Sequence, residues 1–255
     1  CFNKINLKKI NNVFVNPELF RFGVLKNFKD KKKYFKLFID LIFKKIGKEG
    51  TVSLNSYTFQ TLRYNKPFIY EKTEASSGGL SEYFRKLKGA IRSNHQVFSV
   101  TSNGKNKNYI SRNNSQNNYG VGSPYEKFLN LDGKVLNLGM DFHLNPFLHH
   151  VEFIFAVPYI YNKLTRVKYL KNQKKIKKDF ISTVRYLDLE YLPNFRNFIK
   201  KLNEANFIQT EKLGNGYIHL YSAKKYCEVL KKVLQNNVLS LTKNVKFEKG
   251  HYPYK

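Results

Sequence analysis

The chain has 255 residues, of which 42% are hydrophobic and 16% are aromatic. This apolar content is enough for a packed core and excludes global disorder, so we expect one domain over residues 1–255. The sequence contains no apolar run of 18 or more residues and no secretory leader, which predicts a cytoplasmic protein without membrane insertion.

The 46 Lys and Arg residues outnumber the 18 Asp and Glu residues and give a formal net charge of +28. Such a balance favours an anionic partner, of which nucleic acid is the obvious candidate. The lysines are spread along the chain, however, and no nucleic-acid-binding motif is present. The abundance of Lys and Asn also indicates A/T-biased codon usage, so we expect no specific nucleic-acid partner.

Apolar residues in the first half of the chain form short continuous runs in some segments and recur at helical spacing in others. The predicted strands cover residues 13–15, 51–54 and 97–101, and the predicted helices cover residues 34–46 and 80–87. Residues 63–75 and 102–118 are polar, which predicts a loop over the site and a surface loop or loosely packed helix, respectively.

The second half of the chain continues this alternation. Strands are predicted over residues 135–138 and 216–222, and helices over 147–155, 195–202 and 226–234. Residues 168–178 are strongly basic with a turn at Asn172-Gln173, which predicts an exposed hairpin that is either a solvated face or a guard of the site. The fold class is therefore α/β, with a mixed sheet covered by helices.

Polar residues with useful chemistry follow the strand at 135–138, at the end where open α/β sheets bind ligands. If a helix begins near Phe147, His149 and Glu152 are three residues apart and share one face. The carboxylate then holds one ring nitrogen, and the other nitrogen can accept a proton from a substrate. An ordinary structural hydrogen bond would show the same spacing.

Metal binding is the alternative for this stretch, with Asp141, His143, His149 and Glu152 as ligands. No HExxH or Cys/His spacing supports it, so we predict no metal. The two cysteines, Cys1 and Cys227, are far apart in the sequence and indicate neither a metal motif nor a disulfide framework.

The Ser-Ser-Gly-Gly turn at residues 76–79 precedes a predicted helix, and Gly-Val-Gly-Ser-Pro at residues 120–124 is a second turn rich in small residues. Unpaired backbone N–H groups at such helix starts suit a phosphate group. A glycine-rich cap without a ligand would have the same sequence.

Several motifs in this order resemble the signature of the aminoglycoside 3-N-acetyltransferase family. They are Gly-x-Gly-Ser-Pro at 120–124, Leu-x-Gly-Lys-Val-Leu-x-Leu-Gly at 131–139, and Leu-His-x-x-Glu at 148–152. Upstream, Gly-Gly-Leu-Ser-Glu at 78–82 resembles the family's Gly-x-Leu-x-Glu, and Arg-Ser-Asn-His at 92–95 resembles its Arg-Ser-x-His-Pro. The resemblance covers nearly the whole chain and implies the fold of that family.

The resemblance also implies a reaction, in which an acetyl or short acyl group passes directly from acetyl-CoA or another acyl-CoA to an amine of an aminoglycoside or related amino sugar. His149 would be the general base and Glu152 would orient it. Cofactor contacts would come from Ser77, Gly78, Gly79, Gly120, Gly122 and Ser123. Substrate contacts would come from Asp141, Asn145 and His95, although a structural role for His95, through a backbone hydrogen bond, is the other interpretation.

The chain departs from the family pattern at two places, with Asn16-Pro17-Glu18 instead of His-Ser-Ser and Pro146-Phe147 where a threonine is usual. These departures keep two alternatives open: an N-acyltransferase for a nucleotide-linked amino sugar and a CoA-binding paralogue without activity. A basic nucleic-acid-binding protein is the alternative from a different class of function. Relatives usually begin with a helix before the first strand, so we expect such a helix to be missing here. Asp188 and Glu190 are a carboxylate pair that would suit a polyamine substrate.

Overall fold

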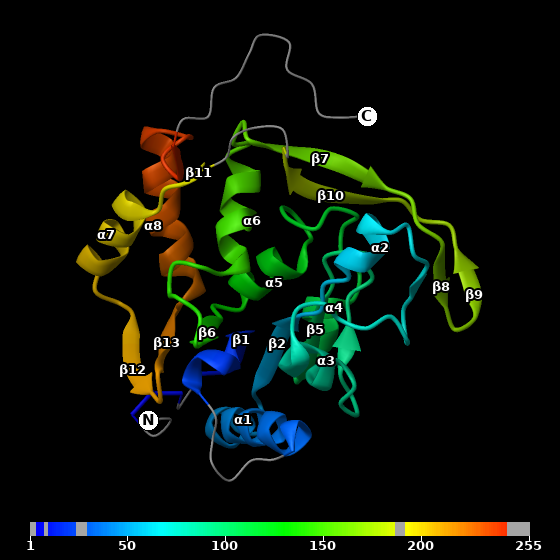
Figure 1. Ribbon diagram of the computed structural model, residues 1–255, viewed down its shortest axis with the longest axis horizontal. Coiled ribbons are helices and arrows are strands. Elements are labelled where there is room, and N and C mark those ends of the chain that lie inside the picture. Colours follow the sequence, from blue (N-terminus) through cyan, green and yellow to red (C-terminus); the bar gives the residue numbers. More distant parts are fainter. Residues whose placement is uncertain (1–3, 8–9, 24–29, 187–191, 244–255) are drawn as a thin grey trace.

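The computed structural model describes residues 4–7, 10–23, 30–186 and 192–243, and a seven-stranded mixed sheet forms its centre (Figure 1). In spatial order its strands are β12 (Gln209–Leu213), β13 (Gly216–Ser222), β6 (Lys134–Leu138), β1 (Asn12–Pro17), β2 (Thr51–Asn55), β5 (Val100–Gly104) and β4 (Ile91–Arg92). The central strands β6, β1 and β2 are parallel, and the outer strands pair antiparallel. The predicted mixed sheet is confirmed.

The central strands are buried on both faces, which explains their continuous apolar runs. Val13 and Val15 in β1 pack on one face of the sheet, and Phe14 packs on the other. Because the carboxyl ends of β1, β2 and β6 meet at one edge, the residues that follow these strands are brought together there.

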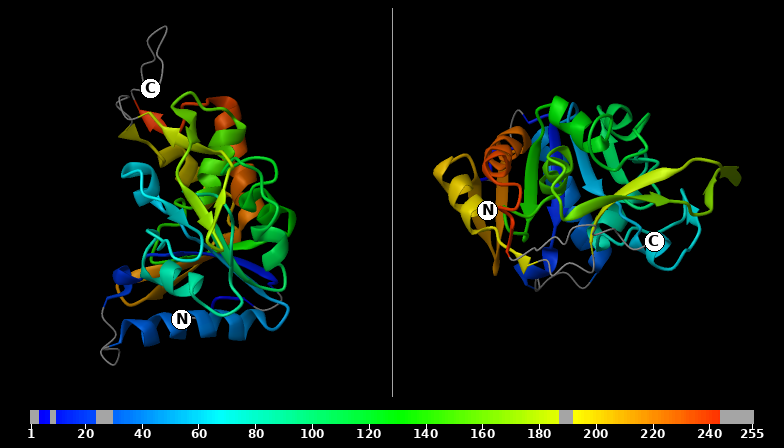
Figure 2. Two further views of the ribbon diagram at one scale, coloured as in Figure 1. Left: turned by 90° about the vertical axis from the view of Figure 1, so that its right-hand side faces the viewer. Right: turned by 90° about the horizontal axis from the view of Figure 1, so that it is seen from above.

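Helices cover both faces of the sheet, as two views show (Figures 1 and 2). One face is covered by α1 (Lys31–Ile46), α3 (Gly79–Arg85) and the 3-10 turn η1 (Leu19–Phe22). The other face is covered by α4 (Lys107–Ser111), α5 (Pro124–Asn130), α6 (Pro146–Ile154), α7 (Arg196–Glu204) and α8 (Ala223–Asn236). None of the described helices has the length and apolar character needed to cross a membrane.

The strand predicted over residues 97–101 begins later than expected, because β5 starts at Val100. The ring nitrogen Nδ1 of His95 accepts the backbone N–H groups of Val97, at 3.2 Å, and Phe98, at 3.0 Å. These bonds bend the chain and remove two N–H groups from any strand pairing. The prediction was wrong at this boundary because it used apolar composition alone.

The two predicted loops contain short elements. Residues 63–75 include β3 (Phe68–Ile69), directly after α2 (Phe59–Arg63), and residues 102–118 include α4. Ile110 in α4 is fully buried, so α4 contributes to the core, while most other residues of 102–118 are exposed or half-buried.

A second, smaller layer lies beside the main sheet. β7 (Ile160–Thr165) and β10 (Phe180–Arg185) form an antiparallel ribbon, which continues into the hairpin of β8 (Tyr169–Lys171) and β9 (Lys174–Ile176). The hairpin turn at Asn172 and Gln173 confirms the prediction, with φ of 48° and 63° as a tight turn requires. A short pair of β11 (Leu192–Pro193) and β14 (Thr242–Lys243) completes the described strands. The acidic pair Asp188 and Glu190 lies outside the described residues.

Candidate functional site

The histidine and the carboxylate predicted to act together are in contact. Asn145 caps α6 by accepting the N–H of Phe147, and Pro146 occupies the first turn, where no N–H is needed. One turn further, Nδ1 of His149 lies 2.6 Å from Oε2 of Glu152. This bond leaves Nε2 of His149 as the other ring nitrogen, on a side chain that is 43% exposed.

Glu152 is 1% exposed, and its surroundings favour the charged form. Its Oε1 atom accepts a hydrogen bond from the hydroxyl of Tyr159 at 2.9 Å and lies 3.7 Å from the guanidinium of Arg185. Burial by itself would raise the pKa of Glu152, but the charge and hydrogen bond of His149, with Arg185 and Tyr159, lower it below its ordinary value. An ionised carboxylate at this position stabilises a protonated His149.

The His149–Glu152 pair opens into a cavity of about 390 Å³ between α6, α2 and the β7–β10 ribbon. The described residues that line it are Phe59, Arg63, Phe98, Tyr119, His149, Glu152, Ile160, Thr183, Val184 and Arg185. We call it the acceptor cavity. Its position beside a buried acid and an exposed imidazole provides a place where a substrate proton can be removed.

The neighbouring histidine has a different environment. His150 is 2% exposed, and its Nδ1 accepts the backbone N–H of Gly120 at 3.3 Å. Burial, together with the charge of Lys231, lowers the pKa of His150 to about 4. His150 is therefore neutral near pH 7 and holds a turn, while His149 faces the cavity.

A second cavity, of about 640 Å³, lies at the carboxyl end of β1. Its described lining residues are Pro17, Glu18, Leu19, Phe20, Gly23, Lys31, Tyr34, Phe35, Gly78, Gly79 and Leu80. Two regions that the sequence analysis treated separately, the strand end at 16–18 and the glycine turn at 76–79, thus share one cavity. The apolar walls and the cation of Lys31 suit a long ligand with an apolar arm and phosphate groups.

Three tyrosine hydroxyls form a hydrogen-bonded cluster beside the acceptor cavity, which the sequence did not predict. The hydroxyls of Tyr57 and Tyr125 are 2.7 Å apart, and Tyr125 donates to Asn55 at the end of β2. Tyr57 also bonds to Tyr119, which lines the acceptor cavity, and its backbone N–H donates to Oγ of Ser77. The one sequence signal for this cluster is the position of Tyr119 directly before the Gly-Val-Gly-Ser-Pro motif.

In the turn over residues 120–123, three backbone N–H groups are hydrogen-bonded to acceptors of the protein itself. The N–H of Gly122 donates to Glu126 at 2.6 Å, that of Ser123 to the carbonyl of Gly120 at 3.2 Å, and that of Gly120 to His150. The cofactor role of Gly120, Gly122 and Ser123 stays a prediction, and it would require these bonds to be exchanged for ligand contacts.

The three predicted substrate contacts lie apart from the described lining of the acceptor cavity. Asp141 is exposed after β6, and Asn145 is the cap of α6, donating to the hydroxyl of Tyr221 at 2.9 Å. His95 accepts two backbone N–H groups through Nδ1 and lies 3.1 Å from the carbonyl of Ile181 through Nε2, with burial lowering its pKa to about 4. These contacts support the structural interpretation of His95.

The metal hypothesis finds no support among the described residues, which contain no group of three or more His, Cys, Asp or Glu side chains placed to hold a metal ion. His143, the fourth candidate ligand, packs its ring against Phe195 at 5.1 Å between centroids.

The fold and these two cavities define an α/β protein with a histidine–carboxylate pair at the edge of its sheet. The sequence profile of the aminoglycoside 3-N-acetyltransferase family matches residues 25–235. The chain belongs to that family of acyltransferases, as its motifs predict.

Solved structures of this class have the same fold. AAC-IIIb in its binary complex with CoASH has a TM-score of 0.74 and 18% identity, over 92% of this chain and 93% of that chain. The YokD protein from Bacillus subtilis has a TM-score of 0.70 and 21% identity, over 92% and 90%. AAC-VIa bound to sisomicin has a TM-score of 0.75 and 16% identity, over 92% and 94%.

Proposed function

We propose that this protein transfers an acyl group from acyl-CoA to an amine of an aminoglycoside or related amino sugar, with His149 as the general base. The observation that carries the proposal is the 2.6 Å bond between Nδ1 of His149 and the buried carboxylate of Glu152, at the wall of a cavity. Family membership and the similarity to AAC-IIIb, solved with CoASH, support the choice of co-substrate.

The chemistry follows from this arrangement. The amine nitrogen attacks the thioester carbon, and Nε2 of His149 takes the proton that the nitrogen loses. Glu152 stabilises the resulting imidazolium through its bond to Nδ1. When the C–S bond breaks, the proton passes from His149 to the sulfur, so the products are an amide and free coenzyme A.

The second cavity is the proposed binding site for coenzyme A, with Gly78 and Gly79 in its wall and Ser77 beside them. A Cβ atom at Gly79 would lie 2.6 Å from the ring of Phe35, so a side chain there would narrow the cavity. Pro17 and Glu18 also line it, and they replace hydroxyl residues of the family pattern. Lys31, on α1, is the cation of the lining that would meet a phosphate.

The test measures thermal unfolding with and without coenzyme A. At a concentration about 100 times the dissociation constant, coenzyme A should add roughly 2.7 kcal/mol to the free energy of unfolding. Lys31→Glu should weaken this stabilisation, whereas Lys33→Glu, also exposed on α1 but outside the cavity, should not. A melting temperature that millimolar coenzyme A leaves unchanged would remove the proposed co-substrate.

A free-thiol assay with acetyl-CoA and a panel of amines then tests the reaction. Aminoglycosides are the acceptors that the family name indicates, and nucleotide-linked amino sugars are the second candidate. Both belong in the panel. The cationic side chains of Arg63 and Arg185 line the acceptor cavity and favour an anionic acceptor, whereas the family name indicates a cationic one. Coenzyme A binding without thiol release from any amine would favour the inactive paralogue, with Pro146 in place of a hydroxyl residue as a reason.

A further inference from the structure

Two arginines occupy the two ends of the β7–β10 ribbon, and each lies beside a carboxylate. The guanidinium of Arg166, directly after β7, lies 3.6 Å from Asp179, and that of Arg185, the last residue of β10, lies 3.7 Å from Glu152. The side chain of Asp179 is 53% exposed, whereas that of Glu152 is 1% exposed. The two pairs have similar lengths, so the burial of the carboxylate is what distinguishes them.

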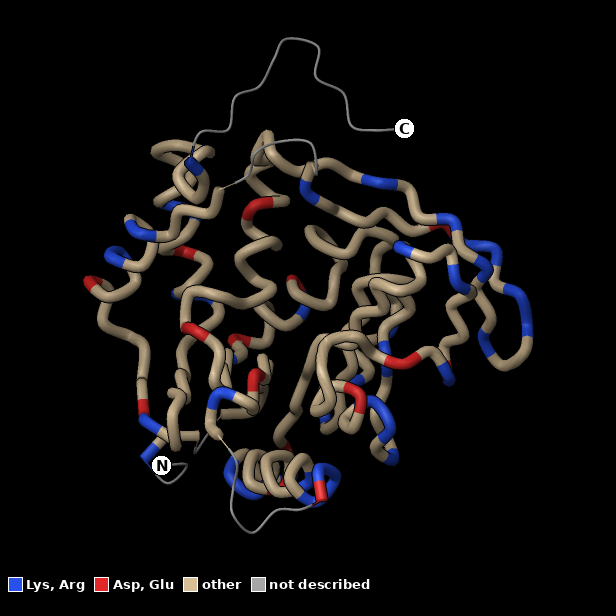
Figure 3. The backbone as a smooth tube through the Cα atoms, in the orientation of Figure 1, with Lys and Arg blue, Asp and Glu red and all other residues tan. Residues whose placement is uncertain are grey.

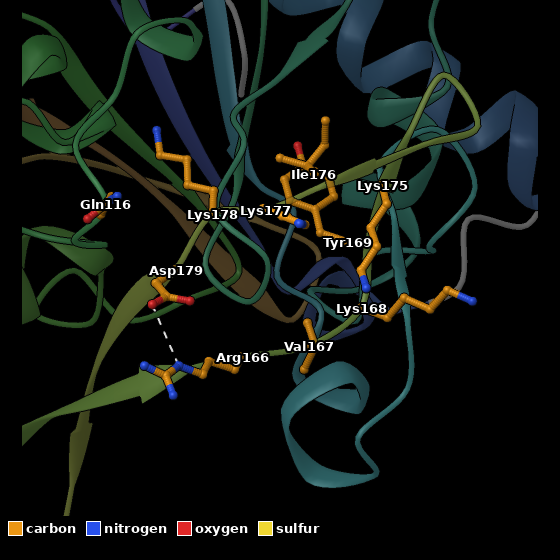
Figure 4. A pocket seen from close by; sticks show the side chains of 10 residues that line it. All are labelled: Gln116, Arg166, Val167, Lys168, Tyr169, Lys175, Ile176, Lys177, Lys178 and Asp179. Carbon is orange, nitrogen blue, oxygen red and sulfur yellow. Dashed lines mark ion pairs between the residues drawn. The ribbon is translucent and has the colours of Figure 1, made fainter.

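The cations around the Arg166–Asp179 pair face solvent. Lys and Arg residues gather along the ribbon and the β8–β9 hairpin (Figure 3). A cavity of about 750 Å³ beside the hairpin has four exposed lysines in its described lining, Lys168, Lys175, Lys177 and Lys178. The same close-up shows the Arg166–Asp179 pair (Figure 4). Because water and salt screen exposed charges, this pair is a weakly interacting reference for the buried contact of Arg185.

The register of the ribbon positions both partners of the Oε1 atom of Glu152. Arg185 pairs with Ile160 at one end of the ribbon. Tyr159 directly precedes Ile160, and its carbonyl accepts the backbone N–H of Tyr186 at 3.4 Å. The hydroxyl of Tyr159 and the guanidinium of Arg185 therefore approach Oε1 from neighbouring places on one scaffold, at 2.9 Å and 3.7 Å.

The ionisation of Glu152 decides which ring nitrogen of His149 carries the proton. An ionised carboxylate only accepts hydrogen bonds, so its bond to Nδ1 requires the proton on Nδ1 and leaves the lone pair on Nε2. A protonated Glu152 would instead donate to Nδ1, and the neutral ring would then carry its own proton on Nε2. Nε2 could not take a proton from an amine in that state. The base therefore works only while Glu152 is ionised.

We infer that Arg185 is a positioning residue for the general base: its charge keeps Glu152 ionised while His149 is neutral, so that Nε2 of His149 holds a lone pair toward the acceptor. This inference rests on the proposed acyl transfer. Burial as complete as that of Glu152 disfavours the charged form of a carboxylate. The hydroxyl of Tyr159 offsets this with a hydrogen bond but carries no charge, whereas Arg185 supplies a positive charge at the same oxygen.

Other ionisable groups lie near the pair. Tyr119 precedes α5 and Tyr226 belongs to α8, and burial raises the pKa of both hydroxyls well above the ordinary value. Both tyrosines are therefore neutral near pH 7. Arg63, the last residue of α2, lines the acceptor cavity and is exposed, so its charge is screened more than that of Arg185.

The experiment is a pH titration of His149 by nitrogen NMR of its imidazole ring, because the chemical shifts report the proton on each nitrogen separately. The missing signals of His149→Ala assign the ring. In Arg185→Met and Arg185→Gln, which both lack the charge, Nε2 should gain its proton at a pH about one unit higher than in the parent. Arg185→Lys keeps the charge and should titrate like the parent.

The matched control is Arg166→Met, at the exposed pair on the other end of the ribbon, which should leave the titration unchanged. Equal titration of Nε2 in the parent and in the two neutral variants would overturn the inference. An equal shift in Arg166→Met or in Arg185→Lys would overturn it as well, because the effect would then not depend on a charge beside Glu152. Thermal unfolding of each variant selects the neutral variant that is folded over the pH range.

The pH dependence of kcat/KM tests the same role during turnover, with acetyl-CoA and gentamicin as the substrates and thiol release as the readout. On the acid side of the profile, Arg185→Met should lower kcat/KM about tenfold, and the difference should disappear toward alkaline pH. An equal loss at every pH would contradict the inference, since it would indicate a purely structural or binding effect. Absence of thiol release from the parent with every amine of the panel would contradict the proposed function, and the NMR titration would still decide whether Arg185 sets the position of the proton.

Discussion

His149 and His150 are adjacent in the sequence, but their side chains have different partners and different exposure. Adjacent residues on a helix point about 100° apart, so only one of the two can share a face with Glu152. The structure gives His149 the carboxylate partner and the cavity, and it gives His150 the N–H of Gly120 and a buried position. We therefore expect substitution of His149 to affect turnover and substitution of His150 to affect stability.

His149→Ala should reduce turnover about 10²- to 10⁴-fold and leave coenzyme A binding nearly unchanged, because the proposed role of the imidazole is to take the proton of the acceptor amine. His150→Gln should retain turnover, since an amide oxygen can still accept the N–H of Gly120, but should lower the melting temperature. Thiol release and thermal unfolding of both variants are the measurements. Loss of turnover only in His150→Gln would mean that the general base has been assigned to the wrong histidine.

At the scale of elements, the junction of β2 and β5 depends on close backbone contact. Gly104 pairs with Thr51 at the end of this antiparallel pair and has φ of +122°. A Cβ atom there would lie 2.1 Å from the carbonyl oxygen of Gly50 and 2.7 Å from Cα of Thr51. Backbone atoms cannot rotate away, so a side chain at this position must separate the strands.

Gly104→Ala should therefore lower the free energy of unfolding by about 3 kcal/mol or more, through both backbone strain and the clash. Gly47→Ala is the matched control, because Gly47 also has positive φ, +75°, but no atom lies within 4 Å of the added Cβ. Strain alone should cost it about 1–2 kcal/mol. Urea unfolding measures both values, and equal losses in the two variants would contradict the close approach of β2 and β5.

At the scale of the whole molecule, three histidines are held neutral in the interior. Burial lowers the pKa values of His95, His150 and His219 to about 4 each. In the unfolded chain a histidine has a pKa of about 6.5, so the unfolded state binds more protons in the interval between these values. Stability should be fully present above about pH 6.5 and should fall as the pH decreases toward 4.

His95→Gln should make this dependence shallower, because one of the three protonation sites is removed. Each buried histidine contributes a slope of at most about 1.4 kcal/mol per pH unit in this interval. Urea unfolding of the parent and the variant between pH 7 and 4.5 gives both slopes. Parallel curves would show that His95 does not titrate differently in the folded and unfolded states.

Much of the secondary structure was determined by the sequence itself. The helix α6, the three-residue spacing of His149 and Glu152, the strand β13 and the turn at Asn172 and Gln173 all follow from apolar periodicity, capping and turn chemistry. The helix and the turn depend on hydrogen bonds between residues close in the chain, and β13 is a short run of mostly apolar residues, so local patterns are sufficient to predict these elements. The family motifs added the expected reaction class.

Only the tertiary structure decided what surrounds these elements. Thr183 and Arg185 reach the wall of the acceptor cavity from β10, more than thirty residues after His149. The bond between His150 and Gly120 likewise joins residues thirty positions apart. Such contacts depend on the topology of the sheet and on which side chains are desolvated together, and neither is encoded in the periodicity of a single segment.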